Sequence, residues 1–126
     1  MKYLLDTHLL LWWLTNSPLL PGQARELIAD PNNTIFVSAV SHWEIWLKSS
    51  IGKLRVPSGF AQKLEAERFE SLPLRAEHTP TLAMLEWHHR DPFDRMLIAQ
   101  ARIEKLILLT ADKALGAYGG VVRVAS

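Results

Sequence analysis

The run Leu106-Ile107-Leu108-Leu109 is apolar at every position, so a strand formed by it would be apolar on both faces. Such strands are typical of the middle of a parallel sheet that helices cover on both sides. Other short runs of aliphatic, β-branched and aromatic residues predict further strands. They cover residues 2–5, 34–37, 72–74 and 121–124, the last as an edge strand. The chain is therefore expected to build an α/β sheet.

Helical patterns fill the segments between the predicted strands. We expect helices over about residues 8–15, 22–30, 39–50, 59–70, 79–87 and 92–104. Ser58 is the expected N-cap of the fourth helix and Asp91 that of the sixth, where Pro92 follows and its missing N–H costs nothing. Strands that alternate with helices imply right-handed crossovers. The predicted fold class is a three-layer α/β/α sandwich with a mostly parallel central sheet, formed by residues 1–126 as a single domain.

The composition excludes several classes of protein. The chain has no cysteine, so it can form neither a disulfide framework nor a thiolate metal site, and a cytoplasmic location is the default. The apolar start of the chain is interrupted by Asp6-Thr7-His8, and the apolar run over residues 9–14 is too short to span a bilayer. We therefore expect no membrane association. A formal charge of +1 neither indicates nor excludes a nucleic-acid partner.

Four acidic side chains are expected at one edge of the predicted sheet. Asp6 follows the first strand, and Asp112 comes just after the strand at residues 106–109. Ligands of such sheets bind outside the carboxyl ends of the strands. Glu44 lies on the helix after the second strand and borders its apolar stripe, and Asp94 lies in the first turn of the 92–104 helix, directed at the sheet. The four carboxylates are therefore expected to converge.

Converging carboxylates in a partly dry site need a cation. Desolvation and mutual repulsion raise their pKa values unless a positive charge intervenes. Oxygen ligands, without cysteine or a paired-histidine motif, favour Mg²⁺ or Mn²⁺ over zinc. Such a cation can lower the pKa of an attacking water and stabilise charge on a phosphate, which is the chemistry of phosphodiester hydrolysis.

The sequence around these acids resembles the PIN domain of the VapC toxin type. The resemblance extends over essentially the whole chain, and the motifs occur in the family's order. The matching segments are Leu4-Leu5-Asp6-Thr7-His8, Ser38-Ala39-Val40-Ser41-His42-Trp43-Glu44-Ile45, Asp91-Pro92-Phe93-Asp94-Arg95-Met96-Leu97-Ile98-Ala99 and Leu109-Thr110-Ala111-Asp112.

The resemblance implies a Mg²⁺-dependent bacterial or archaeal toxin ribonuclease. It also implies an RNA substrate, a homodimer, and silencing by a cognate antitoxin encoded beside the toxin. By position, Asp6, Glu44, Asp94 and Asp112 match the family's acidic quartet as catalytic and metal-binding residues, and Thr110 matches a hydroxyl residue beside it that we expect to contact the substrate. Asp91 competes for the third position, but its place before Pro92 fits a helix cap.

Each acid also has a structural interpretation. Asp6 could form a strand-end turn, Asp94 could favour its helix dipole, and Asp112 could cap a short helix. Glu44 could complete a capping box with Ser41. The apolar stripe expected on that helix consists of Val40, Trp43, Leu47 and Ile51. The joint occurrence of the four acids favours the metal site.

Other residues near the acids have two interpretations. Arg95, with Arg90 and Lys113, could bind the substrate's phosphates, or could be solvated charges. The histidines are more typical of surface or packing positions than of catalysis. The tryptophans could stack on RNA bases, although core or interface packing is favoured. Trp12 and Trp13 are adjacent and cannot share one helix face, so we expect one of them to contact another chain.

Two other functions remain open from the sequence. A catalytically idle PIN-like module could bind proteins through its tryptophan-rich surface, but the intact quartet argues against it. A phospho-signalling receiver or phosphatase shares a parallel sheet with acids at its carboxyl edge. Such sites usually need paired acids at the first strand or a lysine following a late strand, and Asp6-Thr7-His8 lacks the pair of acids. A metal-dependent endoribonuclease is therefore the preferred hypothesis.

Overall fold

The computed structural model describes all residues from Met1 to Ser126. Its centre is a five-stranded sheet in the order β3-β2-β1-β4-β5, and every pair of neighbouring strands is parallel. The strands are β1 (Lys2–Leu5), β2 (Thr34–Ser38), β3 (Glu70–Leu72), β4 (Ile107–Thr110) and β5 (Val122–Val124). The strands β1 and β4 are therefore neighbours, although they come from opposite ends of the chain.

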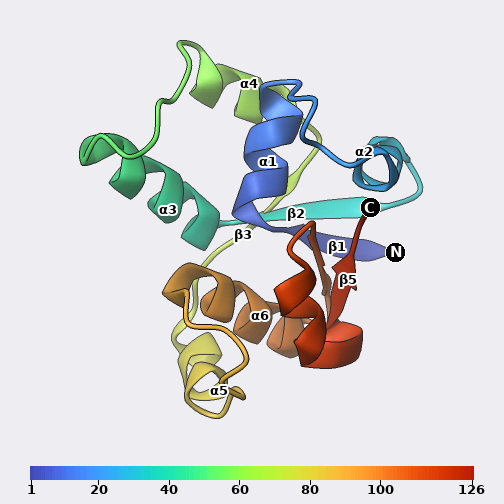
Figure 1. Cartoon of the computed structure of the whole chain (residues 1–126), viewed down its shortest axis with the longest axis vertical. Helices are drawn as coiled ribbons and strands as arrows, with labels where there is room; N and C mark the ends of the chain where they lie inside the picture. Colours follow the sequence, from blue (N-terminus) through green and yellow to red (C-terminus); the bar gives the residue numbers. More distant parts are fainter.

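Helices cover both faces of the sheet, which confirms the expected three-layer architecture (Figure 1). The α-helices are α1 (Thr7–Leu14), α2 (Gly22–Ala29), α3 (Ala39–Ser50), α4 (Phe60–Ala66), α5 (Thr79–Ala83) and α6 (Pro92–Glu104), and the 3₁₀ segments are η1 (Ala76–His78) and η2 (Lys113–Val121). The helices α1, α2 and α4 pack on one face, and α6 and η2 pack on the other. The helix α3 contributes to both cores.

Alternate residues of each strand belong to the two hydrophobic cores, one on each face of the sheet. In β4, Leu109 belongs to the core under α1 and α2, whereas Leu108 belongs to the core under α6. In β1, Tyr3 and Leu5 face the first core and Leu4 the second. Successive side chains of a strand point to opposite faces, so both faces of a central strand must be apolar. This explains the uninterrupted apolar run that the sequence shows at residues 106–109.

Three element boundaries differ from the expected ones. The helix expected over residues 59–70 ends at Ala66, because the chain must extend before β3. Its N-cap position is Gly59, with a φ of 79°, and no side chain caps it, so the expected cap at Ser58 is wrong. The strand expected at 72–74 occupies Glu70–Leu72, since Leu72 is the residue that reaches the core. The helix expected over 79–87 ends at Ala83 and buries no side chain.

The buried face of α3 also differs from the expected stripe. Val40 is buried, but Trp43, Leu47 and Ile51 are exposed. The face that packs inward is Val40, Ser41, Glu44 and Ile45. The capping box expected between Ser41 and Glu44 is absent, because Ser38 is the N-cap and its hydroxyl accepts from the Val40 N–H at 3.0 Å. Glu44 is therefore free of a capping role.

None of the helices has the length and apolar character needed to cross a membrane.

Candidate metal centre

Asp6 is buried at the carboxyl end of β1. Its Oδ1 accepts from the Leu9 N–H at 3.0 Å and caps α1, and its Oδ2 accepts from the Thr110 hydroxyl at 2.6 Å. Burial raises the pKa of Asp6, while the Thr110 hydroxyl and the Leu9 N–H act in the opposite direction. Both donors favour the ionised carboxylate. The cap function and the site function are therefore compatible, because a carboxylate has about four acceptor positions.

Glu44 is a buried acid with one unpartnered oxygen. Only 3% of the residue is exposed, on the inward face of α3. Its Oε2 accepts from Lys48 Nζ, one helical turn later. Its Oε1 is buried without any hydrogen-bond partner. Such an atom is rare in folded proteins and indicates a missing ligand, because an unsatisfied buried oxygen is energetically costly.

Asp94 lies in the first turn of α6, behind the cap formed by Asp91. The Asp91 Oδ1 accepts from the N–H groups of Phe93 and Asp94 at 2.9 and 3.0 Å. Asp94 Oδ2 lies 2.9 Å from His89 Nε2. Burial, followed by the negative charges of Asp91 and Asp6, raises the pKa of Asp94 to about 6, and Glu44 acts in the same direction. The expected cap at Asp91 is thus confirmed, and the role of Asp94 in the site stays a prediction.

Asp112 caps η2 and borders the same site. Its Oδ1 accepts from the Ala114 N–H at 3.0 Å, and its own N–H donates to the Thr110 hydroxyl oxygen at 3.0 Å. Asp112, Asp94 and His89 offer ligand atoms that all lie within 4.8 Å of one another. Thr110 therefore connects Asp6 to Asp112, and Asp94 is close to both.

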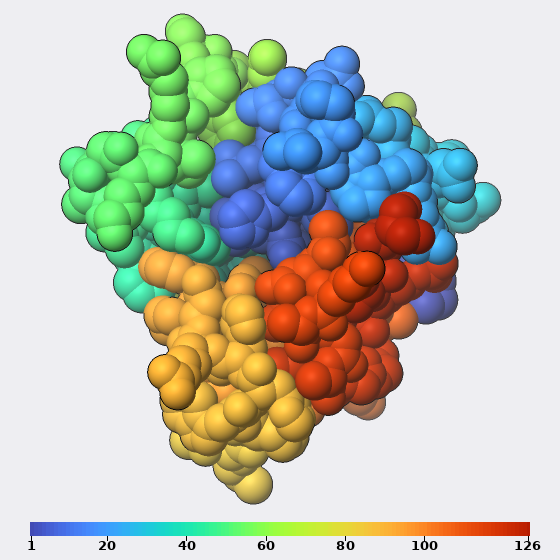
Figure 2. Space-filling view, in the orientation of Figure 1, coloured from blue at the N-terminus to red at the C-terminus, as the bar shows by residue number.

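Four segments that are distant in the sequence meet at this site. In Figure 2 the start of the chain in blue lies between the α3 region in green, the start of α6 in orange and the segment after β4 in red. A cavity of about 290 Å³ is lined by Asp6, His8, Trp12, Ala111 and Asp112. A second cavity, of about 320 Å³, lies between α1 and α3. Glu44, Lys48, Lys53 and His8 are among its lining residues, so the two cavities share His8 and flank the acids.

The donor set fits a hard divalent cation. The ligand atoms on offer are carboxylate oxygens and the imidazole of His89. The raised pKa of Asp94 indicates that this carboxyl lacks a compensating positive charge, and Glu44 keeps one oxygen without a donor although Lys48 pairs with the other. Mg²⁺ and Mn²⁺ favour such oxygen sites. The structure thus places Asp94 close to Asp112 and within electrostatic reach of Asp6 and Glu44, and the joint binding of a cation by the four acids stays a prediction.

Arg95 requires a correction, because it does not face the acids. It is buried, and its guanidinium donates to the backbone oxygens of Glu86 at 2.8 Å and Leu85 at 3.2 Å and to the Tyr118 hydroxyl at 3.1 Å. It also stacks 3.7 Å from the Trp87 ring centroid. These contacts use its donors to hold the segment before α6. The expected phosphate-binding role is therefore wrong for Arg95, because the group is not available to a substrate.

Thr110 is fully buried, and its hydroxyl is occupied by Asp6 and by the Asp112 N–H. We therefore assign it a positioning role for these two acids instead of the expected contact with substrate. Sequence reasoning missed Lys48, although its spacing of four residues from Glu44 is the usual signal for a helical ion pair. It also gave His89 no role, and its place in a loop before α6 offers no periodic signal.

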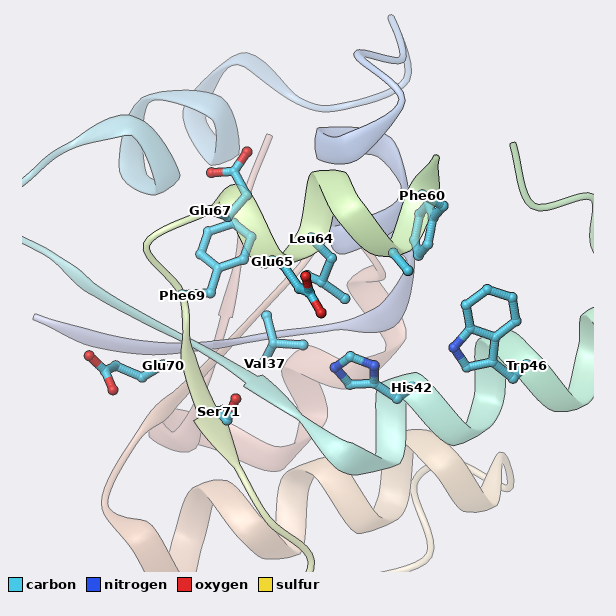
Figure 3. Close-up of a pocket in the computed structure, with 11 residues that line it drawn as sticks. Val37, His42, Trp46, Phe60, Leu64, Glu65, Glu67, Phe69, Glu70 and Ser71 are labelled. Carbon is cyan, nitrogen blue, oxygen red and sulfur yellow. The ribbon is translucent and has the colours of Figure 1, made fainter. Parts of the chain in front are cut away.

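The tryptophans do not gather around the four acids. Trp13 is half-buried and its Nε1 donates to Glu67 at 2.9 Å, while Trp12 lines the smaller cavity beside Asp6. Trp43 is exposed and packs edge-on against Phe93 at 4.8 Å. Figure 3 shows Trp46 at a separate cavity of about 390 Å³ between α3, α4 and β3, which none of the four acids lines.

The fold resembles chains in several solved structures, one of which is described as a toxin-antitoxin complex. A chain of VapBC2 from Rickettsia felis, bound to a promoter DNA fragment, matches with a TM-score of 0.75, 20% identity and coverage of 100% of each chain. A chain of a toxin-antitoxin complex from Klebsiella pneumoniae matches with a TM-score of 0.65 and 16% identity, over 97% of this chain and 96% of that one. FitAcB from Neisseria gonorrhoeae matches with a TM-score of 0.64 and 18% identity, over 95% of each chain.

At these identities the solved structures establish the fold alone. A search of curated proteins found no match. The model of the PIN domain family, in contrast, matches residues 3–121 and so includes all four acids and Thr110. That match extends over nearly the whole chain, and this chain therefore belongs to the PIN domain family.

Proposed function

We propose that this chain is a Mg²⁺- or Mn²⁺-dependent endoribonuclease and the toxin of a toxin–antitoxin pair. The observation that carries the proposal is the surroundings of Asp94: its ligand atom lies within 4.8 Å of that of Asp112, and the charges of Asp6 and Glu44 raise its pKa. A buried Glu44 oxygen without a hydrogen-bond partner supports it. PIN domains are typically nucleases, which supports the reaction class. Neighbouring folds from toxin–antitoxin complexes support the biological role.

Some side chains of the site would bind the cation, and others orient the residues that bind it. Glu44, Asp94 and Asp112 would hold the cation together with Asp6, whose orientation Thr110 fixes. A divalent cation bound there supplies a water of lowered pKa and neutralises charge that develops on the phosphate. Lys53 and His8 line the adjacent cavity, where they can meet the negatively charged RNA backbone. The exposed Arg90 and Lys113 can contribute further phosphate contacts.

The proposed partners are an RNA substrate, a cognate antitoxin and a second copy of the chain. The structures of similar fold that contain an antitoxin support the second of these. Exposed Trp43, Leu47 and Ile51 on α3 support a protein contact, since clustered apolar side chains in water favour association. This face replaces the pair Trp12 and Trp13 as our preferred contact region, because both of those residues are half-buried within the chain.

The function is tested by cleavage of total RNA with Mg²⁺, with Mn²⁺ and with EDTA. Wild type should cut RNA only with a cation, and D6N and D94N should lose at least about a hundredfold in rate, because each removes a charged ligand. The matched control is D91N, which removes an acid from the same turn of α6 but keeps an oxygen that can cap the helix. Equal cleavage by D94N and wild type would refute the mechanism. Antitoxin binding without any cleavage would instead favour an idle interaction module.

A further inference from the structure

Lys48 is the only hydrogen-bond partner of the Glu44 side chain. It follows Glu44 by one turn of α3, and its Nζ donates to Glu44 Oε2. The side chain of Lys48 is about one-third exposed, at 34%, whereas that of Glu44 is 4% exposed. The ammonium thus reaches from the cavity edge into the site. It also lies 5.7 Å from the centre of the Phe93 ring, which places it between α3 and the start of α6.

Two of the other site acids, Asp94 and Asp112, show a similar division between their two oxygens, whereas both oxygens of Asp6 accept hydrogen bonds. Asp94 has one oxygen on His89, and Asp112 has one oxygen on the Ala114 N–H. Each has a second oxygen with no hydrogen bond inside the protein. Glu44 fits this arrangement, because Lys48 holds Oε2 and Oε1 stays buried and unpartnered. In metal sites, groups that hold one atom of a ligand fix the orientation of the ligand and commonly change metal affinity 10–100-fold.

We propose that Lys48 is a positioning residue for Glu44, which holds one carboxylate oxygen so that the other is presented to the divalent cation. This inference rests on the metal site of the proposed function. Glutamate has three side-chain torsions, and no other donor in the protein restrains this one. Without Lys48 the carboxylate would have to be ordered by the cation itself, at a cost in binding free energy.

A simple charge argument predicts the opposite effect. An ammonium near the site repels a cation, so its removal should tighten metal binding if Lys48 acted by charge alone. Positioning and repulsion therefore give opposite signs, which makes affinity the decisive quantity. Lys53 lines the same cavity as Lys48 but makes no hydrogen bond or ion pair with Glu44. It offers a matched control for the charge effect.

The experiment is titration calorimetry with MnCl₂ on wild type, K48M, K48Q, K48R and K53M. We expect K48M and K48Q to bind Mn²⁺ at least tenfold more weakly, K48R to bind closer to wild type, and K53M to bind no more weakly than wild type. In an E44Q background, K48M should cause no further loss. Thermal unfolding with EDTA identifies the variants that are folded, and K48Q provides a second neutral substitution beside K48M.

The outcomes separate this inference from the proposed function. If wild type binds no Mn²⁺, the metal site itself is refuted. If wild type binds but folded K48M or K48Q binds equally or more tightly, Lys48 does not position Glu44. An equal loss in the wild-type and E44Q backgrounds would show that Lys48 acts through another group, which also overturns the inference.

Discussion

Thr110 joins the two ends of the chain through one buried hydroxyl. It donates to Asp6 Oδ2 and accepts from the Asp112 N–H. We predict that T110V lowers the free energy of unfolding by about 1–3 kcal/mol in EDTA, because a buried carboxylate oxygen loses its donor. Cleavage should also fall, since Asp6 loses its orientation. Chemical denaturation and the RNA assay measure the two effects.

A control for T110V is T7V, at another buried threonine. The Thr7 hydroxyl donates to the Ser41 hydroxyl at 3.0 Å, so its removal breaks a bond between neutral groups. T7V also leaves a buried oxygen without its donor, but that oxygen is neutral and the penalty is larger for charged groups, so T7V should lose less stability than T110V. Equal losses in the two variants would contradict the special cost that we assign to the Asp6 carboxylate.

Asp94 should make the metal-free protein less stable as pH rises. Its pKa is about 6 in the folded chain, against the ordinary 3.8. Between these values the folded protein keeps a proton that the unfolded chain has released, so the free energy of unfolding falls as pH rises through this window. D94N has no carboxyl group at this position, so this loss of stability with rising pH should be absent from it. It should match wild type near pH 4 and exceed its stability by on the order of 2 kcal/mol above pH 7.

The measurement is urea denaturation of both proteins in EDTA between pH 4 and 8. The difference in unfolding free energy between D94N and wild type is the informative quantity, because titrating groups that do not interact with Asp94 contribute equally to both proteins. A difference that does not change with pH would show that the Asp94 carboxyl is not strained by burial and by its acidic neighbours.

At the scale of elements, the N-terminus of α6 combines a cap with a site acid. Asp91 accepts from two N–H groups of the first turn, and Asp94 occupies that turn. We predict that D91A lowers the free energy of unfolding by about 1 kcal/mol, because these donors lose their acceptor. D91N should stay near wild type, since asparagine caps as well as aspartate. Thermal unfolding of the two variants in parallel tests this, and equal loss in both would contradict a capping role.

Several elements of the site could be predicted from the sequence for local reasons. Asp91-Pro92 signals the start of α6, and the apolar run at 106–109 signals the central strand before Asp112. The buried face of α3 could not be predicted in this way. Its apolar periodicity selects Trp43 and Leu47, but tertiary packing buries Ser41 and Glu44 instead. Polar residues occupy half of the inward face, so hydrophobic periodicity indicates the wrong side.

Arg95 shows a second limit of sequence reasoning. A basic residue next to a site acid suggests a phosphate contact, but adjacent positions on a helix point about 100° apart. Asp94 faces the site, while Arg95 faces the segment before α6 and binds the oxygens of Glu86 and Leu85. These acceptors lie in irregular backbone, whose path no local pattern specifies. The partners of Arg95 therefore became visible only in the folded chain.

At the scale of the whole molecule, the site depends on long-range closure of the chain. The Thr110–Asp6 hydrogen bond spans 104 residues, and the strands β1 and β4 pair side by side. Folding therefore brings together negative charges that are far apart in the unfolded chain. The overall charge of +1 hides this local excess. A divalent cation should bind the folded protein much better than the unfolded one, because only the folded chain assembles the ligands.

Cation binding should therefore stabilise the whole fold in a concentration-dependent way. A ligand that binds only the folded state adds RT ln(1 + [L]/Kd), or about 2.7 kcal/mol at a hundred times Kd. For a chain of this size we expect Tm to rise by several degrees with MnCl₂ or MgCl₂. D6N should be more stable than wild type in EDTA but gain little from either salt, because burial raises the pKa of Asp6 and its charge is relieved by the cation alone. KCl at matched ionic strength controls for screening. A Tm rise in D6N equal to that of wild type would mean that the cation binds elsewhere, and the closure of the chain around Asp6 would then have no part in metal binding.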